Sequence, residues 1–383
     1  MARTEGMDAP DDVPFDGSEP GNTYFPGPAL TLSEKSSLVR RPDVFLNDEV
    51  ELRPLPPLQQ SATTGRDFKP TQRHALNGEA TCIAVNPGCD IVAVGCIDSR
   101  VLLMDAKSLA PMAAHDLSGN EVKAITAMQF RPDGQGGHDN VAVMAQSDGV
   151  LLVHTSTGRV LSRREELDNC INTLALRPGA ADRLATAGSD TLVRVYDESR
   201  GELLCSLSHG DGERCAGHSS AIYSVVWKPD DPQVLLSGGW DKTVQVWDLR
   251  LRRSVRSLFG PYLCGDALDV APSGDLVLTG SCRHASPLET WDFGSGRLVT
   301  RFAFHQPKED ACMLYCAKFG AGPLEGCAIS GGGGVQPCLR QHLATGELQG
   351  QLTLASSLTG LATLFASRTV IACCTGEVIL LEL

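Results

Sequence analysis

The sequence predicts an all-β protein built from repeats of short strands. After residue 75, one pattern recurs seven times: an apolar run, a Pro or Gly turn, a second apolar run, and a third run that ends near an aromatic residue and Asp. The runs are short, alternate apolar with polar residues and are separated by tight turns, which is typical of strands. The recurrence therefore predicts a repeat architecture over most of the 383 residues.

The clearest copy begins at Gly217-His218. It contains apolar runs over 221–227, 234–238 and 244–248, with a Lys-Pro-Asp turn after the first run. The copies before and after it, over 171–197 and 267–292, match it run for run, and weaker copies begin near Thr81, Ile125, Met313 and Leu358.

The spacing of the copies supports this alignment. The positions equivalent to the closing Asp are Asp105, Thr155, Asp197, Asp248, Asp292, Leu343 and Leu383. In four consecutive copies an Asp also lies six residues before the last position of the third run, namely Asp98, Asp148, Asp190 and Asp241.

Residues Gly217-His218, Ser237, Asp241 and Trp247-Asp248 resemble a complete WD40 repeat. The resemblance covers roughly residues 66–383 and is degenerate in the first, sixth and seventh copies. It implies a seven-bladed β-propeller, in which each repeat supplies a four-stranded blade around a central channel. Because the last two copies lack the diagnostic Asp and Trp, a count of six to eight blades remains open.

The last copy ends the chain at 378–383, so its blade lacks an outer strand. We expect a segment just before the first copy, about Arg66 to Leu76, to supply that strand and close the ring. Closure would protect sheet edges that otherwise template aggregation.

Residues 1–65 form a separate region, an extended acidic tail that precedes the propeller at 66–383. The tail holds nine prolines and eleven acidic residues against five basic ones, which is the composition of a chain that does not fold alone. Two interpretations remain: a solvated extension, or a docking arm that orders on a partner. The apolar anchors of such an arm would be Phe15, Tyr24, Phe25 and Phe45.

The repeat at 217–248 also contains the residue types of a hydrolase triad, His218, Ser237 and Asp241. The WD40 resemblance implies a different role, in which these residues and Trp247 form a buried hydrogen-bonded tetrad. No nucleophile elbow or oxyanion loop accompanies the set, so the structural interpretation is preferred. On the same grounds the resemblance implies that Asp98, Asp148 and Asp190 stabilise turns rather than act as general acids.

We expect no metal and no cofactor. Cys312 and Cys316 lack a second pair of ligands at matching spacing. The run Gly331 to Gly334 lacks the Lys-Ser/Thr of a phosphate-binding loop and falls at the equivalent of a hairpin turn.

The candidate protein-binding residues lie on exposed loops. The position before each turn Asp faces the narrow end of a WD40 ring, and Trp240 occupies it in the fourth copy. Two extra residues in the fifth copy place Arg283 and His284 near Trp240, and Tyr223 could complete the patch. Trp and Arg are frequent energetic anchors of interfaces, although Trp240 could instead pack against a neighbouring blade.

Charge and composition limit the partners. Acidic residues outnumber basic ones by 46 to 33 and no basic run of five occurs, so we expect neither nucleic acid nor a membrane as a partner. Scattered cysteines and the lack of a secretion signal favour reduced thiols in the cytoplasm. No small-molecule substrate is indicated.

These observations lead to a non-enzymatic scaffold that mediates protein–protein interactions, as a subunit of a larger assembly. A cytoskeletal or ciliary setting is the more specific hypothesis. Two alternatives remain: an enzyme that uses the central channel, and a reader of modified peptides for which Arg283 is the nearby cation.

Overall fold

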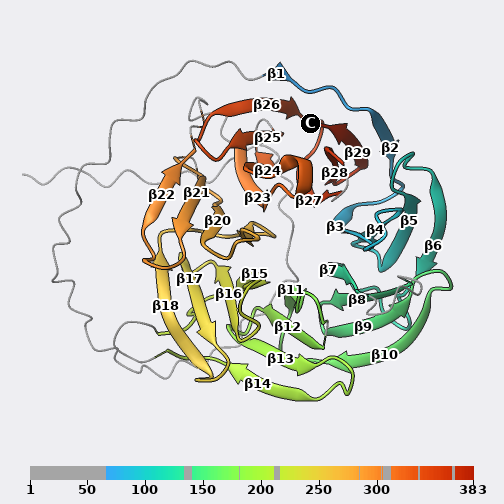
Figure 1. Cartoon of the computed structure of the whole chain (residues 1–383). Coiled ribbons are helices and arrows are strands. Elements are labelled where there is room, and N and C mark those ends of the chain that lie inside the picture. The colour runs from blue at the N-terminus through green and yellow to red at the C-terminus, as the bar shows by residue number, and fades with distance from the viewer. Residues whose placement is uncertain are drawn as a thin grey trace, which may run out of the picture. The chain divides into compact units, whose positions relative to one another are not determined.

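The computed structural model describes residues 66–132, 140–180, 182–210, 216–283, 285–302, 304, 312–334, 337–364 and 367–383. Almost all regular structure in these residues is β-strand, and the strands form seven sheets. Figure 1 shows the sheets arranged as blades of a ring around a common axis. The all-β propeller and the count of seven blades are therefore confirmed.

The first four blades follow one another along the chain. The first contains β3 (Ala80–Val85), β4 (Ile91–Cys96), β5 (Arg100–Asp105) and β6 (Pro111–Asp116). The second contains β7 (Ile125–Phe130), β8 (Val141–Gln146), β9 (Gly149–His154) and β10 (Arg159–Glu165). The third contains β11 (Ile171–Leu176), β12 (Arg183–Gly188), β13 (Val193–Asp197) and β14 (Leu203–Leu207). The fourth contains β15 (Ile222–Trp227), β16 (Val234–Gly239), β17 (Thr243–Asp248) and β18 (Arg253–Phe259).

The remaining three blades complete the ring. The fifth contains β19 (Leu268–Val270), β20 (Leu276–Gly280), β21 (Leu288–Asp292) and β22 (Leu298–Arg301). The sixth contains β23 (Cys312–Phe319), β24 (Cys327–Gly334), β25 (Cys338–Leu343) and β26 (Leu348–Thr353), with a short 3-10 helix, η2 (Gly322–Leu324), between the first two strands. The seventh contains β27 (Leu358–Thr363), β28 (Thr369–Cys374) and β29 (Glu377–Glu382).

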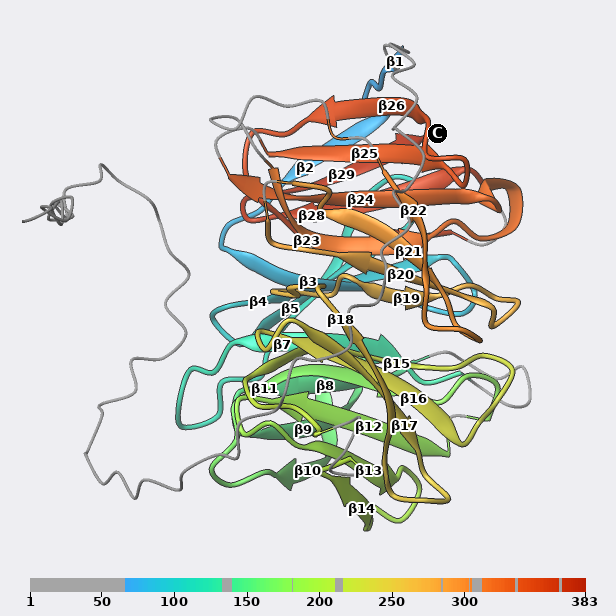
Figure 2. The ribbon, with the colours of Figure 1, turned by 90° about the vertical axis from the view of Figure 1, so that its left-hand side faces the viewer.

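Burial follows the position of a strand within its blade. The first strand of each blade lies nearest the axis and the last lies at the rim (Figure 1). All six residues of β16, a second strand, are buried, whereas six of the seven residues of the rim strand β10 are exposed. Figure 2 shows successive sheets stacked along the ring, and apolar clusters fill the space between neighbouring sheets. Each repeat is therefore stabilised mainly by its neighbours.

The ring is closed by two short strands that precede the first blade, β1 (Arg66–Asp67) and β2 (Gln72–Ala75). Strand β2 pairs antiparallel with β29 and becomes the fourth strand of the last blade, which confirms the predicted closure. Strand β1 adds something the sequence did not predict, because it pairs in parallel with β26 as a fifth strand of the sixth blade. The segment before the first blade therefore joins both of the last two blades.

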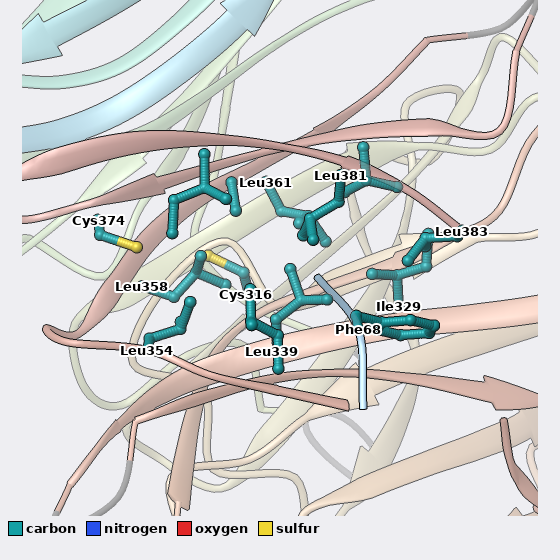
Figure 3. Packing of buried hydrophobic residues seen from close by; sticks show 14 of the residues in the cluster. Phe68, Cys316, Ile329, Leu339, Leu354, Leu358, Leu361, Cys374, Leu381 and Leu383 are labelled. Atoms are coloured by element: carbon teal, nitrogen blue, oxygen red, sulfur yellow. The ribbon is translucent and has the colours of Figure 1, made fainter. Parts of the chain in front are cut away.

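Phe68, between these two strands, is the apolar contribution of the closing segment. Its ring packs into a cluster formed by the sixth and seventh blades (Figure 3), and only 7% of the residue is exposed. The ring lies directly on Gly350 of β26, where an added Cβ would come within 2.3 Å of Phe68 Cζ. A glycine at this position makes room for the aromatic ring.

The four consecutive glycines, Gly331 to Gly334, are not a hairpin turn, and that interpretation was wrong. They form the end of β24 and pair with β23. A Cβ on Gly332 would lie 1.8 Å from the Met313 carbonyl oxygen, so close packing of the two strands explains the lack of side chains better than turn geometry does.

Candidate functional site

The turn between β16 and β17 is held by the four tetrad residues of the fourth blade. His218 Nδ1 lies 2.7 Å from Asp241 Oδ2, and His218 Nε2 lies 2.7 Å from Ser237 Oγ. Trp247 Nε1 donates to the same Ser237 oxygen at 2.7 Å. A consistent assignment of donors runs from the indole N–H to the hydroxyl, from the hydroxyl to Nε2, and from Nδ1–H to the carboxylate.

These contacts have the connectivity of a Ser-His-Asp triad but not its accessibility. A nucleophilic hydroxyl must reach a substrate carbonyl, whereas Ser237 is 0% exposed and its oxygen already accepts the Trp247 N–H. The His218 side chain is also fully buried. The arrangement can therefore fix a turn, and it offers no route for substrate to the hydroxyl.

Asp241 is the anion of this network. Burial acts to raise its pKa, but hydrogen bonds from His218, the Ser219 N–H and Thr243 outweigh burial, so the pKa lies below the ordinary 3.8. The charged carboxylate thus stabilises the turn whose middle residue, Lys242, adopts a positive φ of 60°.

The other turn aspartates act in a similar way with different partners. Asp98 pairs with Arg100, and Asp148 pairs with Lys123 and Arg163. These ion pairs are more exposed than the fourth-blade contact, so they contribute less to stability.

The third blade contains a buried network that sequence reasoning missed. Glu166 accepts hydrogen bonds from Thr186 Oγ1, Tyr196 Oη at 3.0 Å and Asn169 Nδ2 at 2.8 Å. Thr186 and Tyr196 have the ten-residue separation of Ser237 and Trp247, and Glu166 stands where the fourth blade has His218. Alignment of the two copies around this separation is the signal that could have found it.

Trp240 directly precedes Asp241 and is the exposed aromatic residue of this turn. Its backbone N–H bonds to the Ala221 carbonyl at 3.0 Å, and its ring stacks on Tyr223 with a centroid distance of 5.0 Å and an interplanar angle of 26°. Trp240 is still 46% exposed. Burial raises the pKa of Tyr223 to about 12, so this phenol is neutral at physiological pH. The structure thus places these two predicted residues together, as a stacked aromatic pair.

Phe259 extends the apolar surface and was not predicted. It ends β18 opposite Thr243 and is 69% exposed. The next residue, Gly260, donates its N–H to the carbonyl of Lys242, within the turn that carries Trp240. In the first blade Ile97 occupies the position equivalent to Trp240 and is 38% exposed.

Arg283 does not extend freely beside Trp240. Its guanidinium pairs with the buried Glu289 at 2.7 Å and donates to the carbonyls of Ser286 and Gly260. Glu289 also pairs with Arg301. The charge of Arg283 therefore stabilises the fifth blade, through Glu289 and Ser286, and the contact of this blade with Gly260, which follows the last strand of the fourth blade.

Five other predicted binding residues lie outside the part of the chain that the structure describes. They are Phe15, Tyr24, Phe25, Phe45 and His284. Among the described residues, no group of three or more His, Cys, Asp or Glu side chains could hold a metal ion, and no helix is long and apolar enough to cross a membrane.

Comparison with known proteins identifies the repeat. Residues 212–248 match the family model "WD domain, G-beta repeat". The chain is 35% identical to WD repeat-containing protein 1-A of Xenopus laevis over 196 residues, which are 50% of this chain and 29% of that protein. It is 29% identical to WD repeat-containing protein 1 of Gallus gallus over 150 residues, 39% of this chain and 22% of that protein.

A relative with a different name is also similar. Nuclear distribution protein PAC1 of Komagataella phaffii is 31% identical over 113 residues, 30% of this chain and 22% of that protein. The chain spans less than a third of the length of each of these relatives. The matched repeat, the seven blades and the WD-repeat relatives together support a WD-repeat β-propeller family for this chain.

Proposed function

We propose that this protein is a non-enzymatic scaffold that binds partner proteins on the ring face around Trp240. The observation that carries the proposal is an indole 46% exposed to solvent on a turn that a buried tetrad fixes. Natural interfaces concentrate binding energy in a few large aromatic anchors held in place before binding. Stacking on Tyr223 immobilises Trp240 in this way.

The partner on this face is a protein segment with an apolar anchor and basic flanks. Trp240 and Phe259 supply an apolar surface at one turn of the ring. The net charge of -13 favours a basic partner through long-range attraction. A scaffold of this kind holds its partners by loops on a rigid ring and needs no reactive group.

Binding to purified partner measures this proposal directly. Partners captured with the full chain are identified by mass spectrometry, purified, and titrated by calorimetry against wild type, Trp240→Ala and Met112→Ala. Met112 is a matched control because it is an exposed apolar side chain on the rim strand β6. We expect Trp240→Ala to weaken binding by about tenfold or more, a loss of at least ~1.4 kcal/mol, and Met112→Ala to leave Kd unchanged. Equal affinity of wild type and Trp240→Ala would refute the ring-face site.

The acidic tail at 1–65 is proposed as a second docking region on its composition alone. Its aromatic residues would insert into a partner while its charges remain solvated. Deleting residues 1–65 tests this region, because the closing strands begin at Arg66 and are retained. Loss of a stable partner set on deletion supports an arm; unchanged partners refute it.

We place this scaffold in the cytoplasm as a subunit of a multi-protein assembly, with a cytoskeletal or ciliary structure as the specific hypothesis. The support is the similarity to WD-repeat proteins and the acidic, proline-rich composition of residues 1–65. Fractionation of native extract checks it, and absence of the protein from both cytoskeletal and axonemal fractions would refute the setting.

Two features weigh against the alternatives. An enzyme built on His218, Ser237 and Asp241 would need an accessible hydroxyl, and this one is buried. A reader of modified peptides usually uses a cluster of cations, whereas Arg283 is already paired with Glu289.

A further inference from the structure

Two cysteines lie where the loop between the fourth and fifth blades contacts the connection between β20 and β21. Cys264 lies in the connection from β18 to β19, and Cys282 follows β20. The backbones are joined beside them, since the Cys282 N–H donates to the Tyr262 carbonyl at 2.8 Å and the Tyr262 N–H donates to Ser281 Oγ at 3.1 Å. Cys264 follows Tyr262 by two residues, so these bonds hold the two cysteines beside each other. Each thiol shifts the pKa of the other.

The surroundings of this pair differ from those of the core cysteines. Both thiols are half-buried, so a small reagent can reach them. The contact with Cys264 lowers the pKa of Cys282 against the opposing effect of burial, and it raises the pKa of Cys264. By contrast, burial raises the pKa of Cys82 to about 12. A thiolate is the reactive form of cysteine, and sensor cysteines commonly have a second thiol beside them.

We propose that Cys264 and Cys282 form a reversible oxidation site, in which a hydroperoxide such as hydrogen peroxide converts the two thiols to a disulfide. The Cys282 thiolate attacks one peroxide oxygen, the O–O bond breaks, and hydroxide leaves to give a sulfenic acid on Cys282. The Cys264 thiol then loses its proton and attacks that sulfur, an S–S bond forms, and the sulfenic oxygen leaves as hydroxide. The two hydroxides take up the two thiol protons, so one peroxide yields one disulfide and two waters.

Closure requires a movement of the side chains. A disulfide requires the two sulfurs to approach to about 2.05 Å, so the Cys264 side chain must shift from contact to bond distance. Its Sγ also interacts with the Trp240 indole. On the other side of the pair, Met313 Sδ lies 3.4 Å from Cys282 Sγ, so the pair is bordered by a third sulfur that cannot form a disulfide.

The sequence provides a direct readout of the bond. No Lys or Arg lies between Arg256 and Arg283, so trypsin releases both cysteines in the single peptide 257–283. The peptide 165–183 carries Cys170, another half-buried thiol, whose pKa is raised by burial. This second peptide is an internal control for general thiol oxidation in the same digest.

The experiment treats the full, folded chain with a small excess of hydrogen peroxide, alkylates it in denaturant, digests it and weighs both peptides. We expect peptide 257–283 to lose two hydrogen masses and both alkylation sites, and dithiothreitol to restore them, while Cys170 remains alkylated. If peptide 257–283 keeps two alkyl groups, or closes only after the protein is unfolded, the proposal is overturned.

Single variants separate the two roles. Cys264→Ser should trap Cys282 as a sulfenic acid that dimedone labels, whereas Cys282→Ser should leave Cys264 reduced and alkylated. Labelling of Cys264 in the Cys282→Ser protein at the wild-type rate would overturn the assignment. Each variant is first compared with wild type by thermal unfolding. The oxidation site stands whether or not Trp240 binds a partner.

Discussion

Replacing Asp241 by Ala should destabilise the fourth blade by an amount that the hydrogen bonds of the tetrad determine. The carboxylate accepts bonds from His218 Nδ1, the Ser219 N–H and both the N–H and hydroxyl of Thr243. Ser219 is exposed and Thr243 is half-buried, so water can replace part of their bonding. The His218 side chain is fully buried and has no such replacement. Leaving one buried donor unsatisfied costs about 1–3 kcal/mol, and we expect a loss of about 2 kcal/mol.

Thermal and urea unfolding, followed by circular dichroism, measure this loss. At an unfolding entropy of about 2.1 cal/mol/K per residue, a change of about 2 kcal/mol in a domain that spans 66–383 corresponds to a fall of roughly 3 °C in Tm. The matched control is Asp98→Ala, which removes the equivalent turn carboxylate of the first blade. Asp98 pairs with Arg100 and its side chain is 37% exposed, so its removal should cost less than about 1 kcal/mol. Equal losses in the two variants would refute the account of the tetrad.

The same variant tests the charge of Asp241. The pKa of the Asp241 carboxyl in the folded protein is held below the ordinary 3.8. The carboxylate therefore adds its full contribution to the free energy of unfolding above that value, and this contribution is lost as the pH falls through the folded pKa. The stability difference between wild type and Asp241→Ala should therefore be constant from neutral pH to about pH 5 and shrink below about pH 4. A difference that does not change with pH would show that the bonding does not depend on the carboxylate charge.

An enzyme would behave differently, since Asp241→Ala would abolish turnover in a protein that unfolds like wild type.

Two further substitutions test the closure and the unpredicted network. Phe68→Ala should lower the free energy of unfolding by about 3 kcal/mol, because it empties a site between the sixth and seventh blades. The urea midpoint measures this loss, with Phe259→Ala at an exposed position as the control. Similar midpoints for the two variants would contradict the packing role of Phe68. Glu166→Ala should lower the free energy of unfolding by about 2–3 kcal/mol, because Thr186, Tyr196 and Asn169 lose their acceptor. Substitution of the exposed Glu202 by Ala is the control and should change Tm little. A Tm for Glu166→Ala close to that of wild type would mean that the network adds no stability.

The ring could be predicted from the sequence because its determinants are local. Alternating runs recur in every copy and the turn Asp in the first four, and Trp247 with Asp241 marks the fourth copy specifically. The blade count holds even in the sixth and seventh copies, where those residues are missing, because apolar strands alone suffice to form a blade between two neighbours. Closure of the ring by an N-terminal strand could be predicted because the last repeat contains one strand fewer than a blade needs.

Features that depend on register between distant segments could not be predicted. Strand β1 has only two residues, too few to show any periodicity, and its pairing depends on the surface of β26. The contact of Arg283 with Glu289 likewise follows from a turn inside the fifth blade whose shape the sequence does not specify. The four glycines resembled a turn because glycine is frequent in turns, yet here the strand partner excludes side chains.

The pairing of β2 with β29 also has a consequence during synthesis. About 300 residues separate the two strands, so β2 leaves the ribosome long before its partner exists. At typical elongation rates of 5–20 residues per second the delay is roughly 15–60 s. During that interval the earlier blades can stack on one another, whereas Phe68 and the closing strands have no site to occupy. The nascent chain therefore carries an unpaired strand and an exposed aromatic ring for most of its translation. Both features promote aggregation, so this is the period in which binding of a chaperone would protect the chain most.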